Sequence, residues 1–277
     1  MAENFGPRLI ERLRDQGGLC LGIDPSSSTL LEWERPDSLE GLEYFSRALV
    51  ELAIDEVAII KPQVTYFERF GSKGYAILEQ VFTEAREAGL LIIADAKRGD
   101  IGSTNQGYAQ AWLDDRSSLR VDALTVSPYL GVGSLYDLFD RAREGGRGVF
   151  VLAATSNPEG RQIQRARSEE GERVEGMVLG SIREYNRRDE GLGSVGAVVG
   201  ATRDDVAFDW ESMAGPFLVP GVGAQGASVS QVARMFERCI KGSVVVPISR
   251  AITQAGPSQS AVRDAIRRFA DEVRDSF

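Results

Sequence analysis

Short runs of apolar, often β-branched residues recur at near-regular intervals along the whole chain. Eight of them have the length of a buried strand, and most of the gaps between them can hold an amphipathic helix. The eight runs are 19–23, 57–60, 90–94, 123–126, 149–154, 195–199, 217–219 and 243–246. The helical gaps are 41–53, 75–88, 135–142, 171–186, 230–240 and 258–277. Strands that alternate with helices in this way predict an α/β fold, specifically a (β/α)8 TIM barrel.

An open, doubly wound parallel sheet is the competing architecture. No Gly-x-Gly-x-x-Gly motif follows the first apolar run, which argues against the dinucleotide-binding form of that sheet. The chain has 277 residues, close to the usual length of one (β/α)8 barrel, and no change in composition marks a linker. We therefore expect residues 1–277 to form a single barrel domain.

The composition excludes several classes of chemistry and of partner. The chain contains no histidine, so acid–base catalysis must use Lys, Asp, Glu, Tyr or Cys. A net charge of -9 argues against general binding to nucleic acid or to an anionic membrane, although a small anion needs only a locally positive pocket. The two cysteines have no Cys-x-x-Cys spacing, and no signal segment or membrane-length apolar run is present. These features predict a cytoplasmic protein with buried, reduced thiols.

One apolar run ends in a cluster of charges. Residues 90–94 are followed directly by Asp95-x-Lys97 and then by Asp100. Burying charge is costly unless the charges pair, and side chains two apart on a strand point the same way. Lys61 directly follows the neighbouring run 57–60, so an alternating array of Lys61, Asp95, Lys97 and Asp100 is expected at the mouth of the barrel.

This array favours a charged lysine over a neutral one, because each ammonium group has carboxylate neighbours. Such a lysine can donate a proton or stabilise a developing anion. The alternative interpretation is a structural ion-pair network at the end of the strand.

The last two strand ends predict an anion site. Pro220-Gly221-Val222-Gly223 can present backbone N–H groups after the seventh run, with Gln225 in the same loop, and Ser249-Arg250 follow the eighth run. Phosphate sites are common at this position in (β/α)8 barrels, and arginine binds phosphate in a bidentate manner. Glycine-rich turns are, however, often only turns.

Two further polar residues follow strand ends, and each has an ordinary alternative role. Asp24 can bind a sugar hydroxyl or cap the next segment. Ser156 can bind an amide-like ring edge or serve the Ser-Asn-Pro turn. Residues 155–171 form a longer connection than a barrel requires and carry three arginines, so they are either a solvated segment or a mobile element over the site.

Taken together, the motifs resemble those of orotidine 5'-phosphate decarboxylases. Asp95-x-Lys97-x-x-Asp100-Ile101 is similar to the signature of that family, which related phosphosugar barrels share. The supporting matches run in order along nearly the whole chain: Leu21-Gly22-Ile23-Asp24, Lys61-Pro62-Gln63, Thr155-Ser156-Asn157-Pro158, Pro220-Gly221-Val222-Gly223-Ala224-Gln225-Gly226 and Ser249-Arg250. Gly102-Ser103-Thr104 resembles the longer, type 2 branch. Gly102 and Ser249 depart from the shorter branch, which affects loop geometry more than chemistry.

The resemblance implies a homodimeric barrel that converts orotidine 5'-phosphate to UMP and CO2 without cofactor or metal, the last step of de novo pyrimidine nucleotide synthesis. It implies that Lys97 donates the proton to C6 and that Asp95 lies near the departing carboxylate. The other implied contacts are with the ribose (Lys61 and Asp24), the neighbouring subunit's site (Asp100 and Thr104), the pyrimidine edge (Ser156), and the phosphate (Gln225, Arg250 and backbone groups near Pro220 and Ser249).

Two other functions remain open on the same scaffold. A metal-dependent phosphosugar aldolase, such as a hexulose-phosphate synthase, would share Asp95-x-Lys97-x-x-Asp100 but need a divalent cation. A non-catalytic barrel would bind UMP without turning anything over.

Overall fold

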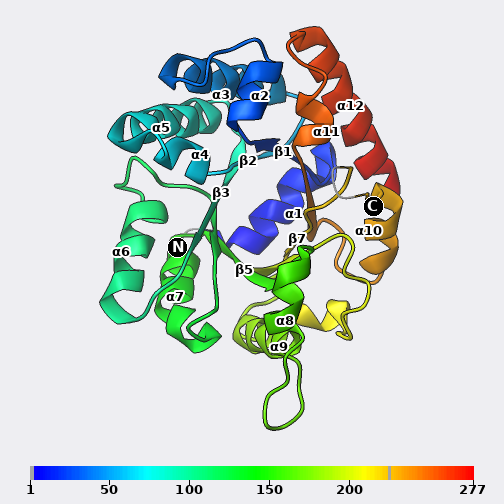
Figure 1. Cartoon of the computed structure of the whole chain (residues 1–277). Coiled ribbons are helices and arrows are strands. Elements are labelled where there is room, and N and C mark those ends of the chain that lie inside the picture. The colour runs from blue at the N-terminus through cyan, green and yellow to red at the C-terminus, as the bar shows by residue number, and fades with distance from the viewer. Residues whose placement is uncertain (1–2, 224–225) are drawn as a thin grey trace.

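The chain forms a closed barrel of eight parallel strands (Figure 1). The structure is a computed structural model and describes residues 3–223 and 226–277. The strands are β1 Leu19–Ile23, β2 Ile59–Pro62, β3 Leu91–Arg98, β4 Ala123–Val126, β5 Gly148–Ala154, β6 Val195–Val199, β7 Phe217–Leu218 and β8 Val244–Ile248. Each strand pairs with the next, and β8 pairs with β1, where Leu21 lies opposite Ile248. The predicted (β/α)8 barrel is therefore confirmed, and the open sheet is excluded.

Helices connect the strands and surround the barrel. The α-helices are α1 Phe5–Gln16, α2 Ser27–Glu32, α3 Leu39–Ala53, α4 Thr65–Glu68, α5 Gly71–Glu87, α6 Gly102–Trp112, α7 Tyr136–Glu144, α8 Arg161–Gln164, α9 Val174–Asn186, α10 Val229–Met235, α11 Arg250–Thr253 and α12 Gln259–Ser276. The described residues also form the short 3₁₀ helices η1 Val132–Leu135, η2 Pro158–Gly160 and η3 Trp210–Met213.

Some helix boundaries differ from the predicted ones. α10 ends at Met235 rather than at residue 240, because the chain then turns and the Cys239 N–H donates to the Phe236 carbonyl. α9 begins at Val174 rather than at residue 171. Two longer helices, α1 and α6, were not among the predicted ones, and neither were the short helices α2, α4, α8 and α11.

Apolar side chains form two separate layers. The outer layer lies between the strands and the surrounding helices. The inner layer fills the barrel with side chains that alternate along the strands, and it continues into α1. It consists of Phe5, Leu9, Leu13, Cys20, Ala58, Ile59, Leu91, Ile93, Ala123, Phe150, Val198, Leu218 and Val245. The rings of Phe5 and Phe150 meet edge to face with centroids 6.2 Å apart, so α1 closes one end of the barrel.

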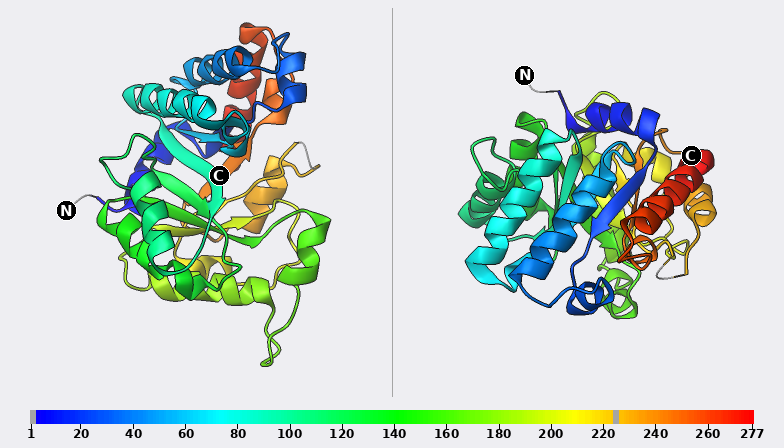
Figure 2. Two further views of the ribbon diagram at one scale, coloured as in Figure 1. Left: turned by 60° about the vertical axis from the view of Figure 1, so that its left-hand side comes forward. Right: turned by 90° about the horizontal axis from the view of Figure 1, so that it is seen from above.

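The two ends of the barrel therefore differ. α1 covers one end, and α2 and α8 lie at the opposite end, where the strands finish (Figure 2). The connection between α8 and α9 projects from the body as a narrow loop held by an antiparallel bridge between Arg167 and Arg173 (Figure 1). In this fold the open end at the carboxyl ends of the strands carries the active site.

Helix composition and cysteine burial bear on two of the other predictions. Among the described residues, no helix combines the length and the apolar character that crossing a membrane requires. Both cysteines are free, and Cys20 is buried inside the barrel as expected. Cys239 is only half-buried, because the turn that follows α10 brings it towards the surface.

Candidate active site

Three of the four predicted charged residues meet at the open end of the barrel. The Lys61 Nζ atom from β2 lies 2.8 Å from Asp95 Oδ2, and the Lys97 Nζ atom lies 2.5 Å from Asp95 Oδ1. Asp95 and Lys61 are buried, whereas the Lys97 side chain is exposed towards the mouth. The carboxylate is thus fixed between two ammonium groups, one inside the barrel and one at its entrance.

A buried threonine completes this arrangement. Thr125 Oγ1 from β4 donates to Asp95 Oδ1 at 3.0 Å and accepts the Lys97 backbone N–H at 3.0 Å. The single hydroxyl therefore orients the carboxylate and the backbone of the exposed lysine together. Thr125 was not among the predicted site residues because it stands within an apolar run. Its position two residues after Ala123, on the same face of the strand, was the available signal.

The end of β3 is bulged rather than regular. The register with β4 shifts between Ala94 and Arg98, and Lys97 has φ of 49°, in the left-handed region that non-glycine residues seldom adopt. Asp95 and Lys97 therefore meet through a local bend and not through simple strand alternation. Backbone strain of this type is typical of functional sites.

The electrostatics keep both Asp95 and Lys61 charged. Burial acts to raise the pKa of Asp95, but the attraction of Lys61 and Lys97 outweighs it and holds that pKa well below its usual range. Burial likewise acts to lower the pKa of Lys61, and Asp95 and Asp24 raise it above its ordinary value. A buried Asp⁻ beside a buried ammonium group is thus the stable state of this pair.

Asp100 does not join the array in the single chain, contrary to the four-member arrangement expected from the sequence. It follows the bulge, and its Oδ1 accepts the N–H of Ile101 at 2.8 Å. Asn105, which is fully buried, accepts the Asp100 N–H at 2.9 Å and donates to the Ser134 carbonyl at 2.7 Å. Asn105 thus fixes the Asp100 peptide, a role that nothing in the sequence indicated.

A cavity of about 220 Å³ begins at Lys61 and extends over the ends of β1, β7 and β8. Its lining includes the predicted residues Asp24, Pro220, Ser249 and Arg250. Asp24 Oδ1 is buried and has no hydrogen-bond partner among the described residues. Arg250 is exposed and forms no ion pair within residues 3–223 and 226–277. The cavity thus offers one unsatisfied acceptor next to the array and one cation further out.

The remaining predicted site residues lie around the mouth. Ser156 follows β5 and is half-buried, and Thr104 is exposed on α6. Gln225 lies outside the described residues. In the connection 155–171, Arg165 Nη2 is 2.5 Å from Asp205 Oδ2, and the Arg167 guanidinium donates to the Gly171 carbonyl. Both arginines are engaged locally, which favours the interpretation of that segment as a solvated loop over that of a mobile element.

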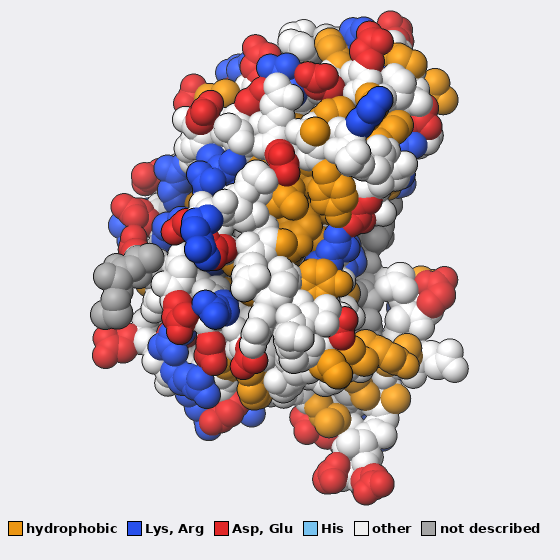
Figure 3. Space-filling model, turned by 90° about the vertical axis from the view of Figure 1, so that its left-hand side faces the viewer, with side chains coloured by type: hydrophobic (Ala, Val, Ile, Leu, Met, Phe, Trp, Pro, Cys, Tyr) orange, Lys and Arg blue, Asp and Glu red, His pale blue; other side chains and the backbone are white. Residues whose placement is uncertain are grey.

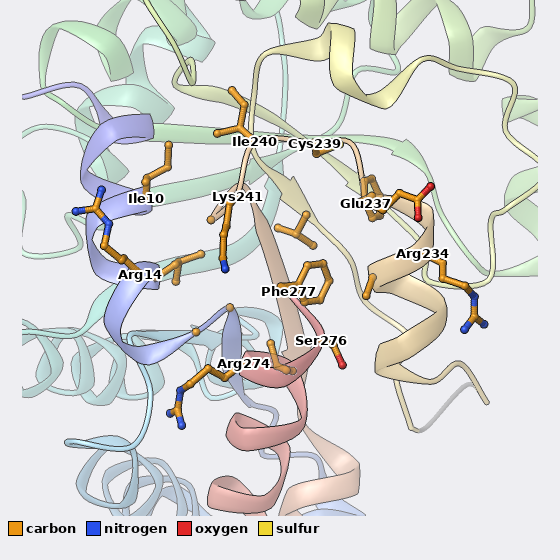
Figure 4. A pocket seen from close by; sticks show the side chains of 18 residues that line it. Ile10, Arg14, Arg234, Glu237, Cys239, Ile240, Lys241, Arg274, Ser276 and Phe277 are labelled. Atoms are coloured by element: carbon orange, nitrogen blue, oxygen red, sulfur yellow. The ribbon is translucent and has the colours of Figure 1, made fainter.

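A larger cavity, of about 760 Å³, lies elsewhere, between α1, α10 and α12 at the closed end of the barrel (Figure 4). It is lined by exposed basic residues such as Arg14 and Lys241 and by apolar ones such as Phe277. It is remote from the Lys61–Asp95–Lys97 array, so size alone does not identify the site.

The comparisons with known proteins agree with one another. Residues 17–265 match the model of the orotidine 5'-phosphate decarboxylase / HUMPS family. The chain is 49% identical to an orotidine 5'-phosphate decarboxylase of Streptomyces coelicolor over 272 residues, which cover 98% of each chain. It is similar to the crystal structure of a putative orotidine 5'-phosphate decarboxylase from Streptomyces avermitilis, with a TM-score of 0.92, 48% identity, and coverage of 99% of this chain and 96% of that one. A corresponding Toxoplasma gondii structure has a TM-score of 0.80, 26% identity, and coverage of 99% and 97%.

Proposed function

The chain belongs to the orotidine 5'-phosphate decarboxylase / HUMPS family, and from this premise we propose that it converts orotidine 5'-phosphate to UMP and CO2 without a cofactor. The observation that supports this most directly is the Lys61–Asp95–Lys97 array, which opens onto a cavity with an unsatisfied Asp24 oxygen. We infer further that residues 1–277 act as one domain, because the β8–β1 pairing joins the two ends of the chain.

The difficult step of this reaction is the loss of CO2 from C6 of the pyrimidine ring. The C6–carboxylate bond breaks, its electron pair stays on C6, and the ring offers no obvious electron sink. The Lys97 ammonium group stabilises this charge as it develops and then transfers one proton from Nζ to C6. Preorganised charge can supply several kcal/mol to such a step, because the groups need no reorganisation during the reaction.

Asp95 contributes in two ways in this proposal. It stays ionised because Lys61 and Lys97 hold its pKa low, so it repels the substrate carboxylate and loses that repulsion when neutral CO2 leaves. It also fixes the position of the Lys97 Nζ atom through the 2.5 Å ion pair.

The cavity beside the array suits the ribose phosphate. Asp24 Oδ1 has an open acceptor position for a ribose hydroxyl, and Lys61 lines the same cavity. The phosphate binds Arg250 and the backbone near Pro220 and Ser249, with Gln225 as a further ligand. Phosphate binding remote from C6 can then orient the ring for decarboxylation.

Following the ultraviolet absorbance of orotidine 5'-phosphate in the presence of EDTA tests this function. A decarboxylase converts the substrate with EDTA present. A metal-dependent aldolase would lose its divalent cation to EDTA and leave the absorbance unchanged. A UMP-binding barrel would bind UMP yet also leave the absorbance unchanged.

The exposed surface near Asp100 supports a homodimer. α6 contains no charged residue, although 26% of the chain is charged, and the loops beside it expose Ile101, Tyr129 and Leu130. Figure 3 shows hydrophobic side chains gathered on this side of the molecule next to a hollow. We propose that a second copy covers this surface and that Asp100 and Thr104 enter the partner's site.

Mixed dimers provide the test of a shared site. Asp100→Asn and Lys97→Ala chains should each be nearly inactive alone. Random mixing should restore about a quarter of wild-type turnover, because one site of each mixed dimer then has both residues. Mixtures that stay inactive although mixed dimers form would show that the two residues serve the same subunit.

A further inference from the structure

A fully buried arginine lies outside the array, in the loop that follows β6. The Arg203 Nη2 atom is 2.5 Å from Glu175 Oε2, and its Nε is 2.9 Å from Asp205 Oδ1. Arg203 and Glu175 have essentially no exposed surface. Burying a guanidinium group is costly unless it is paired and hydrogen-bonded, and here it is paired with two carboxylates.

The remaining donor of this guanidinium reaches the segment after β5. Arg203 Nη1 donates to the Thr155 carbonyl at 3.1 Å and to Gln164 Oε1 at 3.1 Å. Gln164 in turn accepts the Thr155 N–H at 3.0 Å and donates to Thr155 Oγ1 at 2.7 Å. The N–H, the carbonyl and the hydroxyl of Thr155 are therefore all fixed.

Thr155 is followed directly by Ser156, which packs against the β6 loop. A Cβ atom at Gly200 would lie 2.8 Å from both the N and the Cβ of Ser156, so only glycine permits this approach. The Gly200 N–H also donates to the Ala154 carbonyl at 2.7 Å. Ser156 is thus held on one side by Gly200 and on the other by the contacts of Thr155.

We propose that Arg203 is a positioning residue for recognition of the substrate base: it fixes the Thr155–Ser156 peptide so that the Ser156 side chain meets the edge of the pyrimidine ring. This inference rests on the proposed function, together with the contact between Ser156 and the pyrimidine edge that the family resemblance implies. It separates base recognition, which depends on Arg203, from phosphate binding at Arg250 on the ends of other strands.

The Arg203→Lys variant keeps the positive charge but cannot make all four contacts at once. It should raise the KM for orotidine 5'-phosphate and weaken UMP binding by about five- to tenfold. The inhibition constant of ribose 5-phosphate, which lacks the base, should not change. If the hydrogen-bond network only stabilises the fold, the variant should change the affinities for UMP and ribose 5-phosphate equally or should change neither.

Arg173→Gln is the matched control. Arg173 Nη1 also pairs with Glu175, at 3.3 Å, but has no hydrogen bond to Thr155 or Gln164 among the described residues. This variant should leave both affinities at wild-type values. If Arg203→Lys does not fold, Gln164→Ala removes the uncharged contacts to the N–H and the hydroxyl of the same residue, Thr155, and should produce the same selective loss.

A double-mutant cycle with Ser156→Ala tests whether Arg203 acts through Ser156. In the Ser156→Ala background, Arg203→Lys should weaken UMP binding little further. Full additivity, or an equal loss of ribose 5-phosphate affinity, would overturn the inference. Failure of the wild-type protein to decarboxylate orotidine 5'-phosphate would instead refute the proposed function, and the ratio of UMP to ribose 5-phosphate affinity would still measure the Arg203 effect.

Discussion

Replacing Asp95 with asparagine should destabilise the protein, and the structure indicates by how much. The variant leaves two ammonium groups facing a neutral amide. The Lys61 side chain is only 9% exposed, so it becomes a buried charge without its counter-ion, which costs about 3–5 kcal/mol in proteins. The Lys97 side chain is 44% exposed and can be solvated, so the loss of its ion pair with Asp95 adds less than about 1 kcal/mol to the destabilisation.

The expected loss is near the lower end of this range, about 3 kcal/mol, because the amide oxygen can still accept one hydrogen bond. The unfolding entropy of a 277-residue chain is about 0.6 kcal/mol/K, so the melting temperature should fall by about 5 °C. Thermal and urea denaturation followed by circular dichroism measure this change.

Two further variants make the reasoning specific. Asp37 forms an exposed ion pair with Arg69 at 2.5 Å, the same distance as between Asp95 and Lys97. Asp37→Asn breaks this exposed pair and should change stability by less than about 1 kcal/mol. Adding Lys61→Met to Asp95→Asn removes the unpaired charge and should recover part of the lost stability. An Asp95→Asn protein as stable as wild type would refute the view that Asp95 balances a buried ammonium group.

The same geometry gives three other predictions. Arg250→Ala should weaken UMP binding about 10- to 100-fold but leave uridine binding unchanged, because only the phosphate loses a charged partner. Calorimetry measures both affinities, and equal affinity of wild type and variant for UMP would contradict this prediction. Thr125→Val removes the donor to Asp95 and the acceptor for the Lys97 N–H, so kcat should fall about tenfold and stability by about 1–2 kcal/mol, and unchanged values of both would be inconsistent with its role. Folding lowers the pKa of Asp95, so the ionised carboxylate contributes its full stabilisation above the ordinary pKa of 3.8, and this contribution is lost as the pH falls below that value. Denaturation at a series of pH values should therefore show that the free energy of unfolding declines more steeply in acid for the wild type than for Asp95→Asn.

The strands and their order could be predicted from the sequence because each is a short apolar run with turn residues at both ends. The missed helices lacked an equally plain signal. α6 carries small polar residues without an apolar period, which suits a surface that we propose a second copy covers. α1 has apolar residues Phe5, Leu9 and Leu13 at helical spacing, but their role becomes clear only in the closed barrel, where they pack against its inner apolar layer at one end.

The site was only partly predictable, because its finer features depend on contacts distant in sequence. Lys61 and Asp95 could be paired, since each directly follows one of two neighbouring apolar runs. The bulge that turns Lys97 back to Asp95 depends on Thr125 and could not be foreseen from strand alternation. Arg203 stands in the polar stretch 201–205 and has the composition of a solvated loop; its burial depends on Glu175, which the fold brings beside it.

The central claim is that the Lys97 ammonium group carries the chemistry, and one measurement tests it directly. Turnover of orotidine 5'-phosphate by Lys97→Ala should fall about a thousandfold or more, with the circular dichroism spectrum and UMP binding preserved. Lys73→Ala, which removes an exposed lysine on α5, should retain full turnover. Near-wild-type turnover by folded Lys97→Ala protein would contradict the account.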